Sequence, residues 1–205
     1  MTAAEAMAVG AALVAAYLLG SVPSGVLVGR LWRGVDVRQH GSGQTGATNV
    51  LRTIGWKAAA IVTVLDVGKG TAAMLLGGWL AGTEGNLVAG IAVLTGHNWP
   101  VWVGFRGGRG VMPAVGASLV IVPIAAVVGI AFAAMVIGVS RYVSLGSMAG
   151  TVSCCAIMLG LAVQGSEPVE FAPLAMAGGS LIVFRHRENI IRLLRGTERR
   201  LGDPA

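Results

Sequence analysis

The sequence is poor in charge and in aromatic side chains. Only 12% of its 205 residues are charged and only 5% are aromatic, whereas a soluble domain of ordinary composition has about 25% charged residues. The mean hydropathy is +0.76, and 55% of the residues are hydrophobic. This composition argues against a water-soluble globular domain and predicts a bundle of membrane-spanning helices.

Cysteine is also scarce. The chain has two, Cys154 and Cys155, which are adjacent in an apolar run and cannot readily bridge each other. No metal-ligand spacing surrounds them. We therefore expect two small buried hydrophobic side chains, with no metal and no cofactor.

Glycine, by contrast, is abundant, with 32 residues, as is common where helices pack closely in membranes. The apolar segments that we expect to form helices are approximately 6–29, 56–82, 86–103, 111–139, 143–164 and 171–184. No Lys or Arg precedes the first segment, and no clear cleavage site follows it, so we interpret it as a spanning helix and not as a signal peptide.

Basic residues fall in alternate connections of the chain. Three stretches carry 13 of the 15 Lys and Arg residues: 30–57, 104–110 and the tail from Arg185. The other two are Lys69, within an apolar segment, and Arg141, in the turn before segment 143–164. The N-terminus and the 81–86 and 164–170 turns have no Lys or Arg. Because cytoplasmic loops are enriched in Lys and Arg, we expect the basic stretches inside the cell and the other three outside.

The number of crossings follows from parity. With Arg109 inside and Glu167 outside, an odd number of spans lies between them. Residues 111–164 suffice for three short spans of about 18 residues each and are too many for one. The prediction is an all-α polytopic transmembrane bundle of about seven helices. It forms a single domain over residues 1–205, with the N-terminus outside and the C-terminus cytoplasmic.

The formal net charge is +6, and an excess of this sign is also found in nucleic-acid-binding proteins. Here the basic residues gather on one side of a hydrophobic bundle, which explains most of the excess. The remainder lies in loops where it attracts anionic lipid and phosphorylated substrates. We expect membrane lipid as a partner and no nucleic acid.

The loop 40–52 is the first segment suited to binding an anion. Its glycines stand at GxGxxG spacing: Gly41, Gly43 and Gly46. A dinucleotide site would need a βαβ unit around them, but glycines also let backbone N–H groups turn toward any anion. The hydroxyl groups that add donors are Ser42, Thr45 and Thr48. Arg52 can hold phosphate through two hydrogen bonds, although an ordinary flexible loop stays open as an alternative.

A second glycine loop, Arg106-Gly107-Gly108-Arg109-Gly110, follows His97. No Lys-Ser or Lys-Thr continues it, so it is not a Walker A motif. A predicted helix begins after the loop, and the helix N-terminus can face an anion. At this membrane boundary, His97 is as consistent with a substrate contact as with a structural role.

Three further features are ambiguous from the residues alone. The basic tail 185–198 is typical of an amphipathic segment on anionic lipid. Asp66 and Lys69 stand at i,i+3 spacing within an apolar segment, which leaves a structural ion pair and a substrate contact equally open. Gly25 and Gly29 form a GxxxG pattern that predicts close helix packing.

Together these segments resemble the acyl-phosphate-dependent glycerol-3-phosphate acyltransferases of bacteria. The matching stretches follow the family order over nearly the whole chain: 20–25, 41–43, 46–49, 65–70, 96–97, 105–111, 141–147 and 185–198. The resemblance implies a seven-helix enzyme of the bacterial cytoplasmic (inner) membrane, with its active site facing the cytoplasm. It implies acyl transfer from acyl-phosphate to the 1-hydroxyl of sn-glycerol-3-phosphate, which gives lysophosphatidate and phosphate, in the first step of phospholipid synthesis.

The resemblance also implies roles for individual residues. The implied catalytic residues are Ser42, Arg52, His186 and Asn189. The implied substrate-binding residues are Gly41, Gly43, Gly46, Thr48, Asn49, His97, Arg106, Gly107, Gly108, Arg109, Gly110, Ser144 and Glu198. The second loop would hold glycerol-3-phosphate.

The sequence departs from the family pattern at three places. The family has Lys where this chain has Arg109, usually Ala-Thr at Met112-Pro113, and usually Asn-Leu at Gln44-Thr45. Arg holds phosphate with a bulkier, planar group, so the exchange is not neutral for binding. Two other functional classes stay open: a transporter or channel for a small anion, and a catalytically silent relative that binds lipid.

Overall fold

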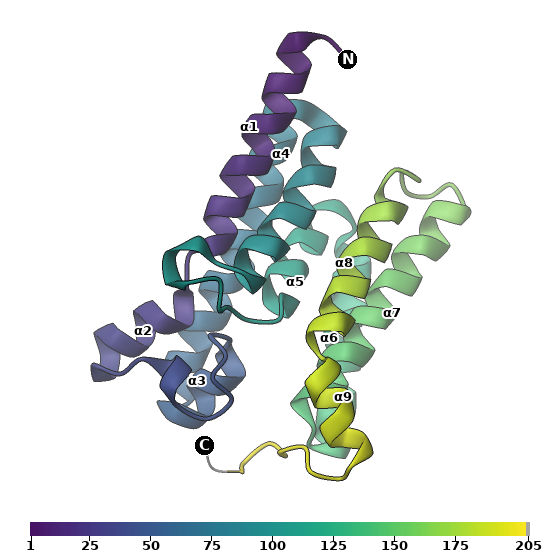
Figure 1. Ribbon diagram of the computed structural model, residues 1–205. Coiled ribbons are helices and arrows are strands. Elements are labelled where there is room, and N and C mark those ends of the chain that lie inside the picture. Colours follow the sequence, from purple (N-terminus) through teal and green to yellow (C-terminus); the bar gives the residue numbers. More distant parts are fainter. Residues whose placement is uncertain (204–205) are drawn as a thin grey trace. The chain divides into compact units, whose positions relative to one another are not determined.

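The computed structural model describes residues 1–203, and all of the regular structure in them is helical (Figure 1). The α-helices are α1 (Ala3–Ser21), α2 (Ser24–Arg33), α3 (Ala47–Thr53), α4 (Trp56–Asn98), α5 (Val111–Ile121), α6 (Pro123–Ser140), α7 (Val143–Val163), α8 (Phe171–Arg185) and α9 (Arg187–Leu194). Two short 3-10 helices, η1 (Val37–Gln39) and η2 (Val101–Val103), lie in the loops. The prediction of an all-α protein is confirmed.

The chain divides into two compact units. The first comprises residues 1–117 and 202–203, and the second comprises residues 118–201. The division falls inside α5, shortly before the break at Val122–Pro123. That the whole chain is one domain stays a prediction.

The first unit begins with a break that the apolar pattern concealed. Segment 6–29 is two helices, because α1 ends at Ser21 and α2 begins at Ser24. Pro23 has no N–H to continue the hydrogen-bond ladder, and it disfavours a helical conformation at the residue before it. Val22 accordingly has ψ of 115°. The prediction of one helix over this segment was therefore wrong.

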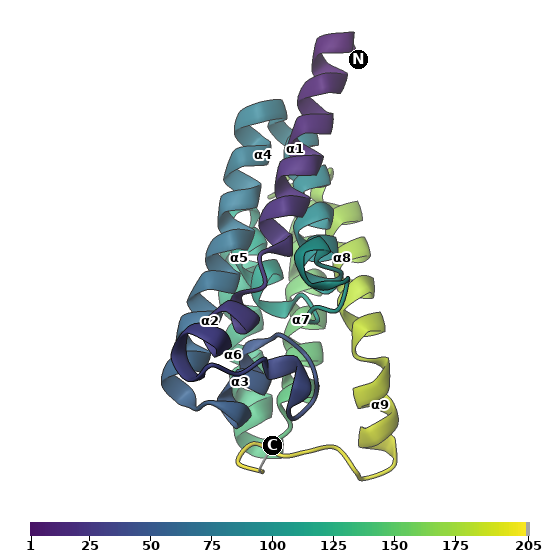
Figure 2. The same cartoon turned by 60° about the vertical axis from the view of Figure 1, so that its left-hand side comes forward.

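Helix α4 folds back on itself as a hairpin. Ala81 and Gly82 have non-helical backbone angles, with φ of +58° at Gly82. A Cβ built on Gly77 would lie 2.6 Å from both Gly85 O and Ala89 Cβ, although 12 residues of straight helix span about 18 Å. The segments 56–80 and 83–98 are therefore antiparallel, as the predicted 81–86 turn requires, and α1 packs along α4 (Figures 1 and 2).

Small residues also hold the second unit together. Helices α6 and α7 pack against each other, and α8 packs against α7. A Cβ built on Gly150 would lie 2.6 Å from Gly129 O and 2.7 Å from Ala133 Cβ, so the two backbones approach closely. The turn between α6 and α7 uses Arg141 in a left-handed conformation, with φ of 62°.

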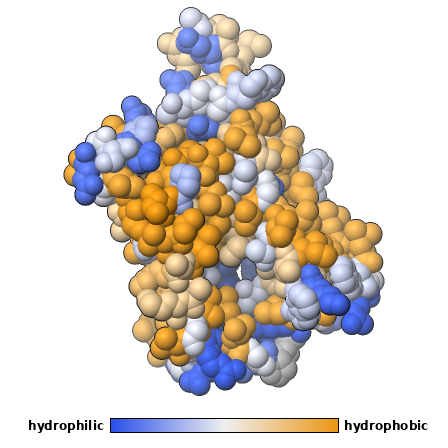
Figure 3. Space-filling model, turned by 180° about the vertical axis from the view of Figure 1, so that it is seen from behind, coloured by the Kyte–Doolittle hydropathy of each residue, from blue (hydrophilic) through white to orange (hydrophobic). Residues whose placement is uncertain are grey.

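Several helices have the length and composition of membrane spans. Four stretches within residues 1–203 qualify: 3–33, 56–103, 123–140 and 143–163. Hydrophobic side chains cover much of the face in Figure 3, and residues such as Val127, Phe132 and Val139 are exposed. Helix α5 has only 11 residues, about 16 Å of helix against about 30 Å of hydrocarbon. We predicted three spans of about equal length within 111–164, but the three helices there have 11, 18 and 21 residues.

Candidate active site

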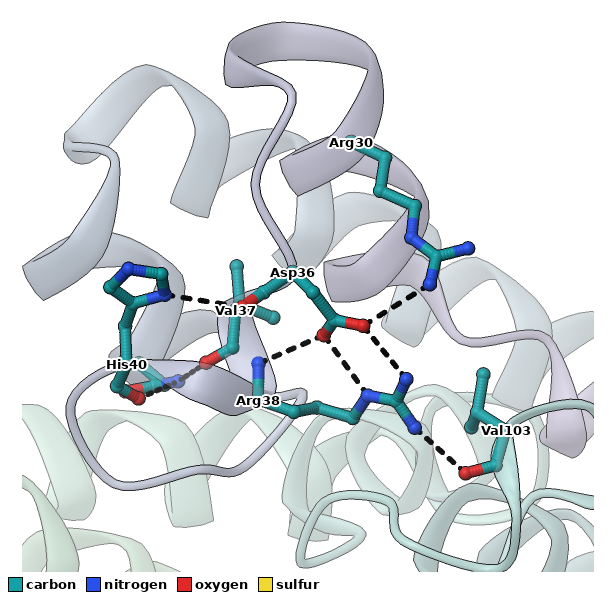
Figure 4. Close-up of polar contacts among 7 residues, drawn as sticks. Arg30, Asp36, Val37, Arg38, His40 and Val103 are labelled. Carbon is teal, nitrogen blue, oxygen red and sulfur yellow. Dashed lines mark hydrogen bonds and ion pairs between the residues drawn. The ribbon is translucent and has the colours of Figure 1, made fainter.

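Asp36 and Arg38 anchor the first glycine loop. Arg38 donates from Nε to Asp36 Oδ1 at 3.0 Å and from Nη2 to Oδ2 at 2.7 Å, and Arg30 adds a bond to Oδ2 at 3.2 Å (Figure 4). These hydrogen bonds, led by that from Arg38, hold the pKa of the Asp36 carboxyl well below its usual range. Arg38 Nη1 also donates to Val103 O at 2.8 Å, which ties this loop to η2.

Asn49 holds the same loop from inside. It is 2% exposed. Its Oδ1 accepts from Ser42 N at 2.9 Å, and its Nδ2 donates to three carbonyl oxygens, those of Val37, His40 and Gln44. Asn49 therefore shapes the loop and fixes the backbone of Ser42, and its side chain is fully engaged in doing so.

Glycines in and beside the first loop serve two purposes. Gly41 and Gly43 have φ of 59° and 69°, where side chains are unfavourable. Gly25 and Gly29 allow close packing, as predicted, but against connecting segments: Gly25 faces Thr45 O, and a Cβ on Gly29 would lie 2.9 Å from Val35 O. Gly46 caps α3, which carries Thr48, Asn49 and Arg52.

A buried polar network lies at the start of α2 and within α4. Asp66 Oδ1 accepts from Ser24 Oγ at 2.8 Å, lies 2.8 Å from Lys69 Nζ, and lies 3.7 Å from His97 Nδ1. Lys69 Nζ also donates to Val22 O at 3.0 Å. All four polar side chains are at most 8% exposed. Of the two alternatives for Asp66 and Lys69, these contacts favour the structural ion pair.

The second glycine loop folds against the end of α4. Gly108 N donates to His97 O at 3.0 Å, and Gly107 N donates to Asn98 O at 3.3 Å. A Cβ on Gly108 would meet the His97 imidazole ring, with Cδ2 at 3.0 Å, and a Cβ on Gly107 would lie 2.6 Å from Pro100 Cδ. The glycines are thus required by this packing, while Arg106 is exposed and Arg109 partly exposed.

The departure at Met112-Pro113 is compatible with the helix that follows the loop. Pro113 lies in the first turn of α5, where backbone N–H groups lack partners within the helix and a proline is tolerated. Gly70 packs against the Pro113 carbonyl. The start of α5 is thereby fixed against α4 directly after Gly110.

In the second unit, Glu198 gathers three donors. Its Oε1 accepts from Ser144 Oγ at 2.7 Å and from Asn189 Nδ2 at 2.6 Å, and its Oε2 accepts from Arg192 Nε at 2.7 Å. Burial raises the pKa of Glu198, but the hydrogen bonds from Ser144, Asn189 and Arg192 outweigh it, so the pKa lies below its ordinary value. Glu198 therefore orients Asn189 as a carboxylate.

His186 lies at the junction of α8 and α9 and is 2% exposed. Its Nδ1 is 2.8 Å from Ile182 O, and because a carbonyl oxygen only accepts, Nδ1 carries the hydrogen. Asn189 lies one turn along α9, and its Oδ1 is buried with no hydrogen-bond partner within residues 1–203.

The residues predicted for the site thus fall into two sets. The first unit holds both glycine loops with Ser42, Arg52 and His97, and the second unit holds Ser144, His186, Asn189 and Glu198. Sequence reasoning did not predict Arg38, Ser24 or Asn98 as parts of these clusters. In residues 1–203, no three His, Cys, Asp or Glu side chains group so that they could hold a metal ion.

The sequence matches known proteins over most of its length. The family described as Glycerol-3-phosphate acyltransferase matches residues 10–196. A glycerol-3-phosphate acyltransferase of Thermoanaerobacter sp. (strain X514) is 44% identical over 189 residues, covering 92% of this chain and 93% of its own. One of Symbiobacterium thermophilum is 46% identical over 186 residues, covering 91% of each chain.

Two solved structures have the same fold. Both are of PlsY, an integral membrane glycerol 3-phosphate acyltransferase, and each is 39% identical to this chain. The glycerol 3-phosphate form has a TM-score of 0.86 and covers 95% of this chain and 96% of its own. The lysophosphatidic acid form has a TM-score of 0.84 and covers 94% of each. The chain therefore belongs to the glycerol-3-phosphate acyltransferase family and is an integral membrane protein.

Proposed function

We propose that this protein transfers an acyl group from an acyl-phosphate to the 1-hydroxyl of sn-glycerol-3-phosphate. The acceptor oxygen forms a bond to the acyl carbon, the bond between that carbon and the phosphate oxygen breaks, and the hydroxyl proton leaves with the phosphate. The products are lysophosphatidate and inorganic phosphate. Support comes from the PlsY structures, whose two forms are described by glycerol 3-phosphate and by lysophosphatidic acid, which differ by one acyl group.

The observation that carries this proposal is the presence of two glycine loops in one unit. The first loop presents Ser42 between two glycines of positive φ, and the second carries Arg106 and Arg109 directly before α5. Two phosphorylated substrates need two anion sites, and glycine loops with cationic side chains provide them. We assign the donor phosphate to Ser42 and Arg52, and glycerol-3-phosphate to the second loop.

His186 and Asn189 are assigned to the reacting groups. His186, whose Nδ1 lies 2.8 Å from Ile182 O, would orient the acceptor hydroxyl or the developing oxyanion. Asn189 is held by Glu198, and its buried Oδ1, which has no partner within residues 1–203, can accept a hydrogen bond from a substrate. An acyl-phosphate already carries a good leaving group, so positioning and electrostatic stabilisation suffice without a covalent enzyme intermediate.

We also propose that the protein lies in the bacterial cytoplasmic membrane with the N-terminus outside and both loops facing the cytoplasm. The distribution of Lys and Arg supports this orientation. Cysteines introduced at the 81–86 turn and near the C-terminus, in a chain with Cys154 and Cys155 replaced, should react with an impermeant reagent from opposite sides. Labelling of both from one side would contradict the proposed topology.

The proposed reaction is tested with purified protein and two donors. Acyl-phosphate should yield lysophosphatidate and phosphate in equal amounts, and acyl-CoA should yield little or no product. A transporter or a silent relative would release neither product. Comparable rates with acyl-CoA would overturn the assignment of the donor.

A further inference from the structure

Asn98 is the last residue of α4 and is 0% exposed. Neither Nδ2 nor Oδ1 of its amide has a hydrogen-bond partner among the residues that the structure describes. Buried amides are nearly always hydrogen-bonded, because an unpaired one loses its hydration without compensation. An amide in this condition therefore calls for a role in another conformation or in binding.

The amide faces the loop that the proposed function assigns to glycerol-3-phosphate. A Cβ built on Gly110 would lie 3.3 Å from Asn98 Oδ1 and 3.6 Å from Nδ2. Gly110 has φ of 86°, which glycine adopts far more readily than other residues. At the other end of the turn, Gly107 N donates to the Asn98 carbonyl. Asn98 thus lies beneath both ends of the 107–110 turn.

We propose that Asn98 is a positioning residue of the acceptor site, whose amide hydrogen-bonds to the 106–110 loop in the anion-holding conformation of that loop. An anion turns loop N–H groups toward itself, and each such rotation turns the neighbouring carbonyl group the other way. Positions 107, 108 and 110 are glycines, whose backbone angles are the least restricted, so the turn has more conformations available than other residues would allow. The inference rests on the proposed function, since it identifies the anion as glycerol-3-phosphate.

This role predicts that replacing Asn98 does not lower the stability of the protein. If an asparagine only supports the fold, its replacement lowers the stability of the protein. An unpaired amide destabilises the chain, so Asn98→Leu, which has a similar volume and no polar atom, should keep or raise the melting temperature while weakening acceptor binding. Gain of stability with loss of binding is what a residue reserved for function should show.

Asn86 supplies a matched control on the same helix. Its Oδ1 is also buried and without a partner within residues 1–203, and it lies next to Gly78, where a Cβ would be 2.8 Å away. The two asparagines are 12 residues apart, about 18 Å along the helix. Asn86→Leu therefore removes a partly buried amide, whose oxygen is also unpaired, far from the loop.

The experiment compares the wild type, Asn98→Leu and Asn86→Leu by thermal unfolding in detergent and by steady-state kinetics. Asn98→Leu should raise the KM for glycerol-3-phosphate by about tenfold or more, with the KM for acyl-phosphate unchanged and a melting temperature at or above that of the wild type. Asn86→Leu should leave both KM values unchanged. If Asn98→Leu does not fold, Asn98→Ala is measured in its place.

Several results would overturn the inference. These are a wild-type KM for glycerol-3-phosphate in the folded Asn98 variant, an equal rise in KM in Asn86→Leu, or a failure of both Asn98 variants to fold. A wild-type protein that does not acylate glycerol-3-phosphate would instead refute the proposed function on which the inference rests.

Discussion

Lys69 Nζ lies 2.8 Å from Asp66 Oδ1, one turn away on α4, and both side chains are buried. The same oxygen accepts from Ser24 at 2.8 Å and lies 3.7 Å from His97 Nδ1. This local ion pair therefore connects α2 and both antiparallel segments of α4. One of those segments, 83–98, carries the second glycine loop on its end, so the pair positions the loop from within the bundle.

Loss of one partner of the Asp66–Lys69 ion pair should destabilise the protein. Asp66→Leu leaves the Lys69 charge buried and unpaired, which should cost about 3–5 kcal/mol of unfolding free energy. The double variant Asp66→Leu/Lys69→Met should recover much of that loss, because no buried charge remains. Unfolding of the single and double variants in detergent measures this, and a double variant no more stable than the single one would contradict it.

The hydrogen bonds between Arg38 and Asp36 predict that the stability of the protein depends on pH. Its folded-state pKa is lowered by the hydrogen bond from Arg38 below the ordinary value of 3.8, so its stabilisation is fully present above that value and declines as the pH falls below it. Asp36→Asn should be less stable than the wild type at pH 7, and the two melting temperatures should converge as the pH is lowered from 4 toward 2. Melting temperatures across pH 2–7 provide the measurement. A gap that does not change, or that widens in acid, would count against the assignment.

Replacement of Glu198 should destabilise the protein more than replacement of Ser144, one of the residues that donate to it. Glu198→Gln keeps an acceptor for Ser144 or Asn189 but loses the charge paired with Arg192, with an expected cost of about 1.5–3 kcal/mol, whereas Ser144→Ala removes one hydrogen bond worth about 1 kcal/mol. Because Glu198 orients Asn189, Glu198→Gln should also lower kcat. Chemical unfolding and turnover of both variants decide the order, and a larger loss in Ser144→Ala would reverse this reading.

Gly108 should tolerate no side chain. A methyl group there would meet the His97 ring, so Gly108→Ala should displace the loop and raise the KM for glycerol-3-phosphate by about tenfold or more. Gly68→Ala is the control, because a Cβ at that helical position meets nothing within 4 Å and should be neutral or slightly stabilising. Similar kinetics of the two variants would show that the loop does not depend on this contact.

Sequence reasoning succeeded where the determining contacts are local. The i,i+3 spacing of Asp66 and Lys69, which places two side chains on one helix face, made an ion pair one of two open alternatives, and the structure favours it. The turn of α4 fell where two apolar segments meet at Gly82. Ser24 and His97 join Asp66 across 42 and 31 residues, and no spacing rule predicts such contacts. The break at Pro23 was not predicted, because the apolar run continues on both sides of the proline.

Motifs indicated the segments of the candidate site, but the contacts that individual residues make within the protein could be read only from the structure. Asn49 looked like a substrate ligand, yet its amide is engaged with the first loop's own backbone. Glu198 looked like another ligand, and it is saturated by Ser144, Asn189 and Arg192. An amide or carboxylate can bind a substrate or shape a loop with the same atoms, so only the contacts distinguish the two. For Asn98, the available signal was a polar residue within the apolar segment 86–103.

The most direct test of the central claim is steady-state kinetics of Arg109→Ala and His186→Ala, with KM and kcat determined separately. Arg109→Ala should lose a charge-assisted bond worth about 1.5–3 kcal/mol and raise the KM for glycerol-3-phosphate by about one to two powers of ten, while Arg109→Lys keeps measurable activity because the charge remains. His186→Ala should instead lower kcat, because its role is at the reacting groups. An unchanged KM for glycerol-3-phosphate in Arg109→Ala, or full turnover in His186→Ala, would contradict the account.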